Sequence, residues 1–243
     1  SLKANILSQI ENVNIVDITH EVDHFNILQG ALILKNCFKD FPRDTVHIIS
    51  IDDELSINND HVAVYAHGHY FVGADNGFFS ILLDDFKPDK IVSLNISQKT
   101  DFLTFASRDV FVTAACHIKR GGTLELIGKE VEDFKVKKNL LMPVIDANII
   151  KGVITYIDNY GNAITNIDLT TFEKNRRSRN FSILFGREDE EIKKISTKYK
   201  EVEIAEKLAI FNSNNYLQIS INQGSANTLL GLNFFDIIRI EFK

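Results

Sequence analysis

Four short segments of this 243-residue chain place acidic, amide or hydroxyl side chains directly beside apolar runs. Polar, turn-forming residues at the ends of strands are a common way in which a site is built on a sheet edge. Ser107 lies just ahead of a predicted helix, where free backbone N–H groups converge and suit a small anion. Taken singly, each segment also has a structural explanation, as a turn or a helix cap. The segments are Ile51-Asp52-Asp53, Thr104 to Asp109, Asp158 to Asn162, and Asn222 to Ala226.

A second candidate for chemistry is the His67-Gly68-His69 sequence. Two imidazoles at this spacing are able to bind a metal, but no third ligand is evident nearby. The pattern favours a turn with exposed imidazoles, and we predict no metal site.

The first half of the chain predicts an α/β domain. Apolar runs at 14–18 and 45–51 read as strands, and between them a helix capped by Asp23 runs to Phe41-Pro42. This βαβ order favours a parallel sheet with flanking helices. Further elements are then expected in the order hairpin, strand and helix, at 61–65 with 70–72, at 90–94, and at 109–120 before Gly121-Gly122.

The second half has a different residue pattern, which predicts a smaller β-barrel or sandwich domain. Short strand-like runs follow one another, separated by Asn, Gly and Ser turns. We place the domain boundary near Leu141-Met142-Pro143, which gives domains of 1–142 and 143–243. The basic cluster 174–179 is interpreted as a solvated loop rather than a phosphate site. The expected strands are 152–157, 181–185, 208–211, 216–221 and 237–242.

Composition narrows the function classes. With 27 Lys+Arg against 33 Asp+Glu, the net charge of −6 argues against nucleic-acid and membrane partners, which require a basic face. Cys37 and Cys116 have no metal-like spacing and read as reduced core residues. No run approaches the roughly 20 apolar residues that span a bilayer, and no leader opens the chain. We expect a cytoplasmic protein that acts on a small molecule.

The order of motifs along nearly the whole chain resembles the S-adenosyl-L-methionine hydroxide adenosyltransferases, which share a fold with the fluorinating and chlorinating adenosyl transferases. An ordered series is far more specific than one motif. The matching text is Ile15 to His20, Gly30-Ala31, Phe41-Pro42 with Thr45-Val46-His47, Tyr70-Phe71-Val72 with Asp75-Asn76-Gly77, Thr104-Phe105 with Arg108-Asp109, Tyr156 to Asn162 with Thr165-Asn166-Ile167, and Asn222 to Ala226 with Leu230-Gly231-Leu232.

The resemblance implies attack of hydroxide or halide on the ribose 5′ carbon of S-adenosyl-L-methionine, with release of methionine and without metal or other cofactor. It implies a homotrimer in which each site lies between the N-domain of one subunit and the C-domain of its neighbour. By the same resemblance Thr104, Phe105 and Ser107 line the reaction centre. Asp158 and Asn162 contact the methionine part, and Asn222 with the Gln223 backbone reads adenine, with Asn214 nearby.

The chain also departs from the pattern. Hydrolytic members carry an Asp, Arg, His triad. Asp52 is retained, but the other two positions are Asn59 and Ala106. The family's ribose-binding segment, and with it a first strand, is expected upstream of residue 1. Three readings stay open: a hydrolase that uses Asp52 as base with Ser107 holding water, a catalytically impaired nucleoside-binding protein, and a halide-dependent transferase.

Overall fold

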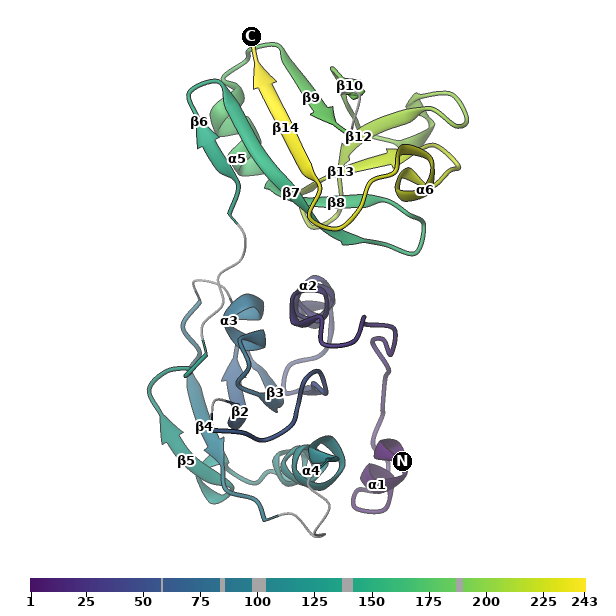
Figure 1. The fold of residues 1–243 in the computed structure, drawn as a ribbon. Helices are drawn as coiled ribbons and strands as arrows, with labels where there is room; N and C mark the ends of the chain where they lie inside the picture. The colour runs from purple at the N-terminus through teal and green to yellow at the C-terminus, as the bar shows by residue number, and fades with distance from the viewer. Residues whose placement is uncertain (58, 84–85, 98–103, 137–141, 187–189) are drawn as a thin grey trace. The chain divides into compact units, whose positions relative to one another are not determined.

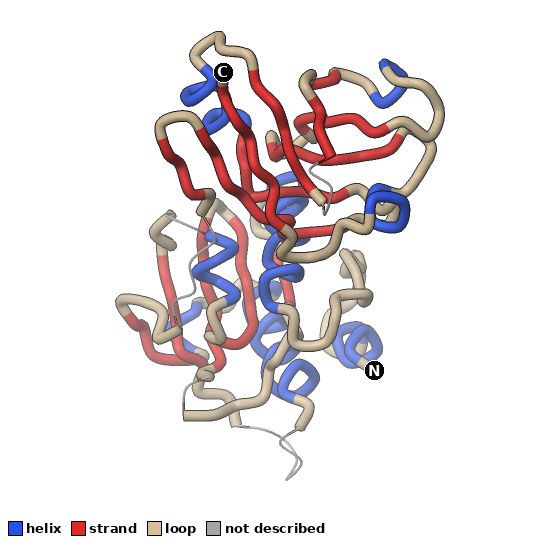
Figure 2. The backbone as a smooth tube through the Cα atoms, turned by 45° about the horizontal axis from the view of Figure 1, so that its top comes forward, coloured by secondary structure: helices blue, strands red, loops and turns tan. Residues whose placement is uncertain are grey.

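The computed structural model describes residues 1–57, 59–83, 86–97, 104–136, 142–186 and 190–243. The chain divides into two compact units, unit 1 (Ser1–Leu140) and unit 2 (Leu141–Lys243). Unit 1 combines a sheet with helices, and unit 2 consists mostly of strands (Figure 2). The predicted fold class, an α/β domain followed by a β domain, is therefore confirmed.

Unit 1 contains a mixed sheet in the order β1-β3-β2-β4-β5. β1 and β3 are parallel, whereas β2 is antiparallel to both β3 and β4. It follows that β1, β3 and β4 all run in one direction. The strands are β1 (Val46–Ile48), β2 (His61–Ala66), β3 (His69–Ala74), β4 (Lys90–Leu94) and β5 (Gly128–Val131).

Helices cover both faces of this sheet (Figure 1). Alternate residues of a strand face opposite ways, so Val62 and Val64 pack with α2 and α3 while Ala63 packs with α4. The helical segments of unit 1 are α1 (Leu2–Leu7), α2 (Ile27–Cys37), η1 (Phe38–Asp40), α3 (Phe78–Leu83), η2 (Ser107–Phe111), α4 (Val112–Lys119) and η3 (Leu124–Leu126).

Two local predictions in unit 1 are wrong. The run 14–18 is not a strand, and Val16 and Ile18 are 64% and 38% exposed, so the apolar residues have no sheet to pack on. The helix cap is Asn26, whose side chain accepts from the Gln29 N–H, rather than Asp23. The parallel pair of the sheet therefore comes from β1 and β3 alone.

Unit 2 forms a sheet that curls toward closure. Its described strands follow the order β10-β9-β14-β7-β8-β13-β12-β11, with β6 paired to β7. An ion pair between Lys207 of β12 and Glu190 of β10 links strands from opposite parts of this order. All five predicted strands are found. The strands are β6 (Val144–Asp146), β7 (Ile149–Ile157), β8 (Ala163–Asp168), β9 (Phe181–Phe185), β10 (Glu190–Ile192), β11 (Ile195–Ser196), β12 (Lys207–Phe211), β13 (Tyr216–Ile221) and β14 (Ile237–Phe242).

The basic cluster 174–179 is not a simple solvated loop. It includes the last turn of α5 (Leu169–Arg176) and the exit from this helix. Arg179 donates to the carbonyls of Ala147 and Asn175 and lies over the Phe242 ring. Part of the positive charge therefore stabilises the fold. The other helical segments of unit 2 are η4 (Tyr199–Glu201) and α6 (Ala226–Leu230).

Cys116 is buried and Cys37 is partly buried, and both are free thiols. Burial raises the pKa of the Cys37 thiol, as expected of a reduced core residue. Among the residues described above, no helix combines the length and the apolar character that crossing a bilayer requires.

Candidate functional site

Two polar segments of unit 1 directly follow the carboxyl ends of strands that run in the same direction: Asp52 follows β1 and Asp75-Asn76 follows β3. The segment Thr104 to Ser107 begins ten residues after β4 and leads into η2, whose Phe111 ring meets the His61 ring edge-on at 4.8 Å. His61, which opens the antiparallel strand β2, lies at the same edge. Ligand sites of α/β sheets characteristically lie outside the carboxyl ends of the strands. The topology thus brings the predicted N-domain residues to one edge of the sheet.

Asp52 lies in a tight loop directly after β1. Its backbone is left-handed, with φ 49°, and its side chain is exposed. The neighbouring Asp53 accepts a hydrogen bond of 2.8 Å from the Ser50 hydroxyl. Of these two adjacent carboxylates, Asp52 is the one that faces solvent, as a base in contact with a ligand must before the ligand binds.

Ser107 opens a π-helical turn, η2, which runs into α4. Such turns insert an extra residue into a helix and occur frequently at functional sites. Ser107 is 1% exposed, and its Oγ has no hydrogen-bond partner among the residues that the structure describes. A buried hydroxyl without a partner is costly unless a water, an ion or a ligand completes it.

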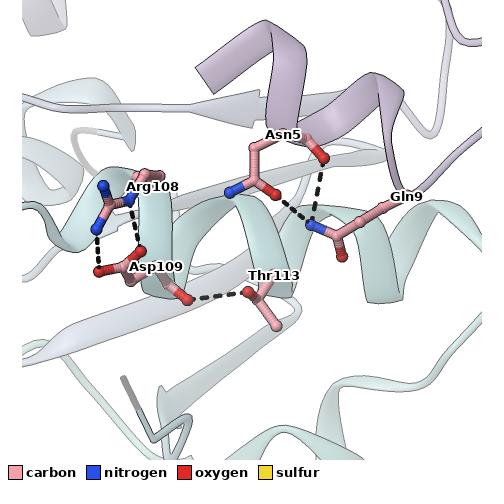
Figure 3. A network of polar contacts seen from close by, with 5 residues as sticks. All are labelled: Asn5, Gln9, Arg108, Asp109 and Thr113. Carbon is pink, nitrogen blue, oxygen red and sulfur yellow. Dashed lines mark hydrogen bonds and ion pairs between the residues drawn. The ribbon is translucent and has the colours of Figure 1, made fainter. Parts of the chain in front are cut away.

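The following residues lock this turn in place (Figure 3). The Arg108 guanidinium binds the Asp109 carboxylate through Nε and Nη2, at 2.6 and 2.9 Å. Thr113 Oγ1 donates to the Asp109 carbonyl at 2.9 Å, and α1, with its Asn5–Gln9 hydrogen bond, packs alongside. Asp109 itself lies inside the π-helical turn.

Thr104 and Phe105 precede the π-helical turn at the surface of unit 1. The Phe105 ring is 37% exposed, and the Arg108 guanidinium lies 5.1 Å from its centroid. The Phe105 carbonyl accepts from the N–H groups of Arg108 and Asp109. The exposed ring gives this edge an apolar surface close in sequence to the buried Ser107 hydroxyl.

The two positions that depart from the triad have structural roles. Asn59 Nδ2 donates to the carbonyls of Asp52 and Glu54, at 3.0 and 2.9 Å. Ala106 is 1% exposed and packs with Val110 and Phe111 in the core of unit 1. Neither side chain presents a charge to a ligand.

Asn76 is a site residue to which the sequence assigned no role. Its Nδ2 donates to the carbonyls of Ile51 and Asp52, at 2.7 and 3.0 Å. The neighbouring Asp75 is 3% exposed, and burial raises the pKa of its carboxyl. The only sequence signal was the Asp75-Asn76-Gly77 motif, which carries no information on its partners 24 and 25 residues earlier.

In unit 2 the Asp158–Asn162 turn is held by its own polar groups. Asp158 Oδ1 accepts from the N–H groups of Tyr160 and Asn162, and Oδ2 accepts from Asn162 Nδ2 at 2.8 Å. The Gly161 carbonyl accepts from the Asn227 N–H at 2.9 Å. The turn therefore lies beside the 222–226 segment, and two of the predicted segments are brought together.

The three residues expected near adenine are not all neighbours within this chain. Asn222 is buried and donates through Nδ2 to the Val202 carbonyl, while Gln223 is exposed with φ 55°. Asn214 lies before β13 and Asn222 after it, so the strand Tyr216–Ile221, about 20 Å long at the usual rise, separates them.

The histidine turn differs from its prediction. His67 and Gly68 form the hairpin turn with φ of 54° and 80°, but His69 is buried, and its Nδ1 lies 3.3 Å from His47 Nε2. Burial, followed by the charge of His69, lowers the pKa of His47 to about 4. Within the described ranges, no three His, Cys, Asp or Glu side chains converge as metal ligands would.

Comparison with known sequences gives two matches that cover most of the chain. The model of the SAM hydroxide adenosyltransferase N-terminal domain matches residues 1–128, and that of the C-terminal domain matches residues 152–239. An (R)-S-adenosyl-L-methionine hydrolase from Methanocaldococcus jannaschii is 28% identical over 100% of this chain and 90% of its own length. A fluorinase from Actinoplanes is 22% identical over 71% of this chain and 67% of its own.

Comparison with solved structures extends this similarity to the fold. The crystal structure of an uncharacterized conserved protein from Thermotoga maritima has a TM-score of 0.86 and 27% sequence identity. The match covers 98% of this chain and 93% of the Thermotoga maritima protein. A conserved hypothetical protein from Thermus thermophilus has a TM-score of 0.74 over 100% of this chain and 92% of its own length, at 24% identity.

Proposed function

Because this chain belongs to the S-adenosyl-L-methionine (SAM) hydroxide adenosyltransferase family, we propose that it hydrolyses SAM to adenosine and methionine. The observation that carries the proposal is the buried Ser107 Oγ without a partner, in a π-helical turn at the carboxyl-end edge of the unit 1 sheet. This hydroxyl is suited to hold the attacking water.

The reaction makes modest demands on the protein. The water oxygen bonds to the ribose 5′ carbon while the C–S bond breaks. The electron pair of the C–S bond goes to sulfur, which gives the neutral thioether of methionine. A sulfonium is a good leaving group, so no acid is required on departure. The protein must align the water with the C–S bond, exclude bulk solvent and accept one proton.

The unit 1 residues divide these tasks. Ser107 accepts a hydrogen bond from the water or donates one to its oxygen, and Asp52 accepts the proton. Phe105 offers an apolar surface that excludes solvent. Asn59 and Ala106 supply no second base, so the proposed catalysis depends on Asp52 alone.

Unit 2 is proposed to hold the two ends of the ligand. The Asp158–Asn162 turn would bind the methionine part, and Asn222 with the Gln223 backbone would bind adenine. Asn214 and Asn222 lie at opposite ends of β13, so we propose that Asn214 meets a ligand held elsewhere in a homotrimer. The side chains of Tyr160 and Leu229 are exposed near the Asp158–Asn162 turn and the 222–226 segment. Their exposure is consistent with a surface that a neighbouring subunit covers.

A second candidate function is binding of SAM or adenosine without turnover. It is favoured by the commitment of the Asn59 amide to backbone carbonyls and by the burial of Ala106, which leave Asp52 without a charged helper. A halide-dependent reaction is the weaker alternative, for which the similarity to a fluorinase is the supporting observation.

One experiment separates the three. The purified protein is incubated with SAM in H₂¹⁸O, with and without chloride or fluoride, and the products are separated by chromatography. We expect adenosine and methionine in equal amounts, with ¹⁸O in the 5′ hydroxyl. Asp52→Asn should reduce the rate by on the order of 10² to 10⁴, whereas Asp53→Asn, the adjacent carboxylate bound to Ser50, should reduce it far less.

The other outcomes are equally clear. Stoichiometric binding of SAM by calorimetry without adenosine would establish the binding function. A halogenated adenosine would establish the halide reaction. Absence of both binding and product would contradict every member of the proposal.

A further inference from the structure

The loop that carries Asp52 is held through its backbone by side chains. Four consecutive carbonyls, from Ile51 to Glu54, each accept at least one hydrogen bond from a side chain. Asn76 Nδ2 reaches Ile51 and Asp52, Asn59 Nδ2 reaches Asp52 and Glu54, and His61 Nε2 lies 2.9 Å from the Asp53 oxygen. We call these three side chains the loop clamp.

The members of the clamp are themselves fixed. Asn76 is 6% exposed, and its Oδ1 accepts from the Phe78 N–H, which opens α3. His61 is 4% exposed, and its ring meets the Phe111 ring edge-on at 4.8 Å. Since a carbonyl only accepts, Nε2 of His61 carries the proton. Asn76 and His61 therefore donate from buried positions whose geometry the core determines, whereas Asn59 is only partly buried.

The loop has a reason to need such support. Backbone pairing between β1 and β3 continues to the Ile49 N–H, which donates to the Val72 carbonyl, and the next pairing described in this stretch joins Ser56 with Asn59. Between them, Asp52 adopts a left-handed backbone, a conformation that residues with a Cβ rarely adopt. Two amide donors converge on the carbonyl of that same residue.

We propose that Asn76 and Asn59 are positioning residues for the Asp52 carboxylate, with His61 holding the next carbonyl. The inference rests on the proposed function, because it assigns the clamp to the reaction in which Asp52 is the base. The clamp contacts only the backbone of the loop, so it leaves the carboxylate free to meet the ligand. Its effect is on where the carboxylate points, not on how tightly SAM binds.

The test uses an almost isosteric change that replaces the NH₂ donor with a carboxylate oxygen. Asn76→Asp keeps an oxygen for the Phe78 N–H but sets a second oxygen against the Ile51 and Asp52 carbonyls. Asn59→Asp makes the same change at a less buried position, in case Asn76→Asp fails to fold. The matched control is Asn175→Asp, where the lost donor serves the Thr171 carbonyl in α5 of unit 2.

The kinetic readout is adenosine release by wild type, each variant, Asp52→Asn, and the double variants with Asp52→Asn. We expect kcat to fall roughly 10- to 100-fold with KM within about threefold, as a displaced catalytic group predicts. Asn175→Asp should leave both constants unchanged. If the clamp acts through Asp52, each double variant is no slower than Asp52→Asn alone. Additive losses, or a change confined to KM, would overturn the inference.

Hydrogen exchange of the 50–57 segment keeps the test independent of activity. If wild type releases no adenosine, the proposed hydrolysis is wrong. Hydrogen exchange still tests whether the clamp holds the loop. Faster exchange of this segment in Asn76→Asp than in wild type and Asn175→Asp supports a loop held by Asn76. Unchanged exchange contradicts it.

Discussion

Gly161 lies against Ser225 so closely that a Cβ at position 161 would stand 2.0 Å from the Ser225 Oγ. The two residues belong to turns 64 positions apart, and the hydrogen bond from Asn227 N–H to the Gly161 carbonyl joins the same turns. The contact places Asp158 and Asn162 beside the loop that contains Asn222. The absence of a side chain at position 161 is therefore a condition for the unit 2 half of the proposed site.

Gly161→Ala should separate these turns. At φ 77° an added Cβ costs about 1–2 kcal/mol in any setting, and the clash with Ser225 adds to this. Gly231→Ala is the control, because it has φ 65° but nothing within 4 Å of its Cβ. We expect Gly231→Ala to lower the free energy of unfolding by the backbone cost alone and Gly161→Ala to lower it by more. Gly161→Ala should also bind SAM at least tenfold more weakly by calorimetry. Equal effects of the two variants would refute the role of the contact.

Ser107→Ala should affect stability and activity in opposite directions. Removing a buried hydroxyl without a partner should keep or raise the free energy of unfolding, by up to about 2 kcal/mol, while adenosine release falls at least tenfold. Ser220→Ala is the contrasting variant, since that buried hydroxyl accepts from Gln218 Nε2 at 2.8 Å and its loss should destabilise unit 2. A destabilised Ser107→Ala with unchanged turnover would contradict the assignment.

The strands of unit 2 were predictable because their apolar residues are local signals. Tyr216–Ile221 and Phe181–Phe185 are rich in β-branched and aromatic residues and are bounded by turn formers. The 14–18 run shows the limit of this reasoning. It is also rich in β-branched residues, yet strand formation requires a neighbouring strand with which to pair, and composition does not report one.

The candidate site was predictable only in part. The sequence proposed Asp52 because it follows a predicted strand and Ser107 because it precedes a predicted helix. Asn76 donates to carbonyls 24 and 25 residues earlier, and such contacts depend on strand pairing that no local pattern encodes. The basic cluster was interpreted as a loop because a run of charged residues is usually solvated. In the structure α5 ends within this cluster, and its C-cap, Arg177, has a left-handed conformation.

Arg179→Lys should destabilise unit 2 although it keeps the charge. The guanidinium donates to Asn148 Oδ1 at 2.6 Å and to the Asn175 carbonyl at 2.8 Å, geometry that a single ammonium does not reproduce. We expect a loss of about 1–3 kcal/mol in chemical denaturation. Arg177→Lys, at an exposed position of the same cluster, should change stability by less than about 0.5 kcal/mol. Equal losses in the two variants would contradict a specific role for these contacts.

The buried His47–His69 pair predicts a loss of stability in mild acid. The pKa of His47 is lowered from 6.5 to about 4, chiefly by burial, so the unfolded chain binds a proton more readily than the folded one. The contribution is complete above pH 6.5 and is lost as the pH falls toward 4, by about 3 kcal/mol in total. His47→Gln retains a donor for His69 Nδ1 without this titration, and its free energy of unfolding should depend less on pH over that interval. His24→Gln, at an exposed position, should follow wild type. Denaturant unfolding at pH 7, 6, 5 and 4 measures the difference, and an identical acid loss in His47→Gln and wild type would exclude His47 as its source.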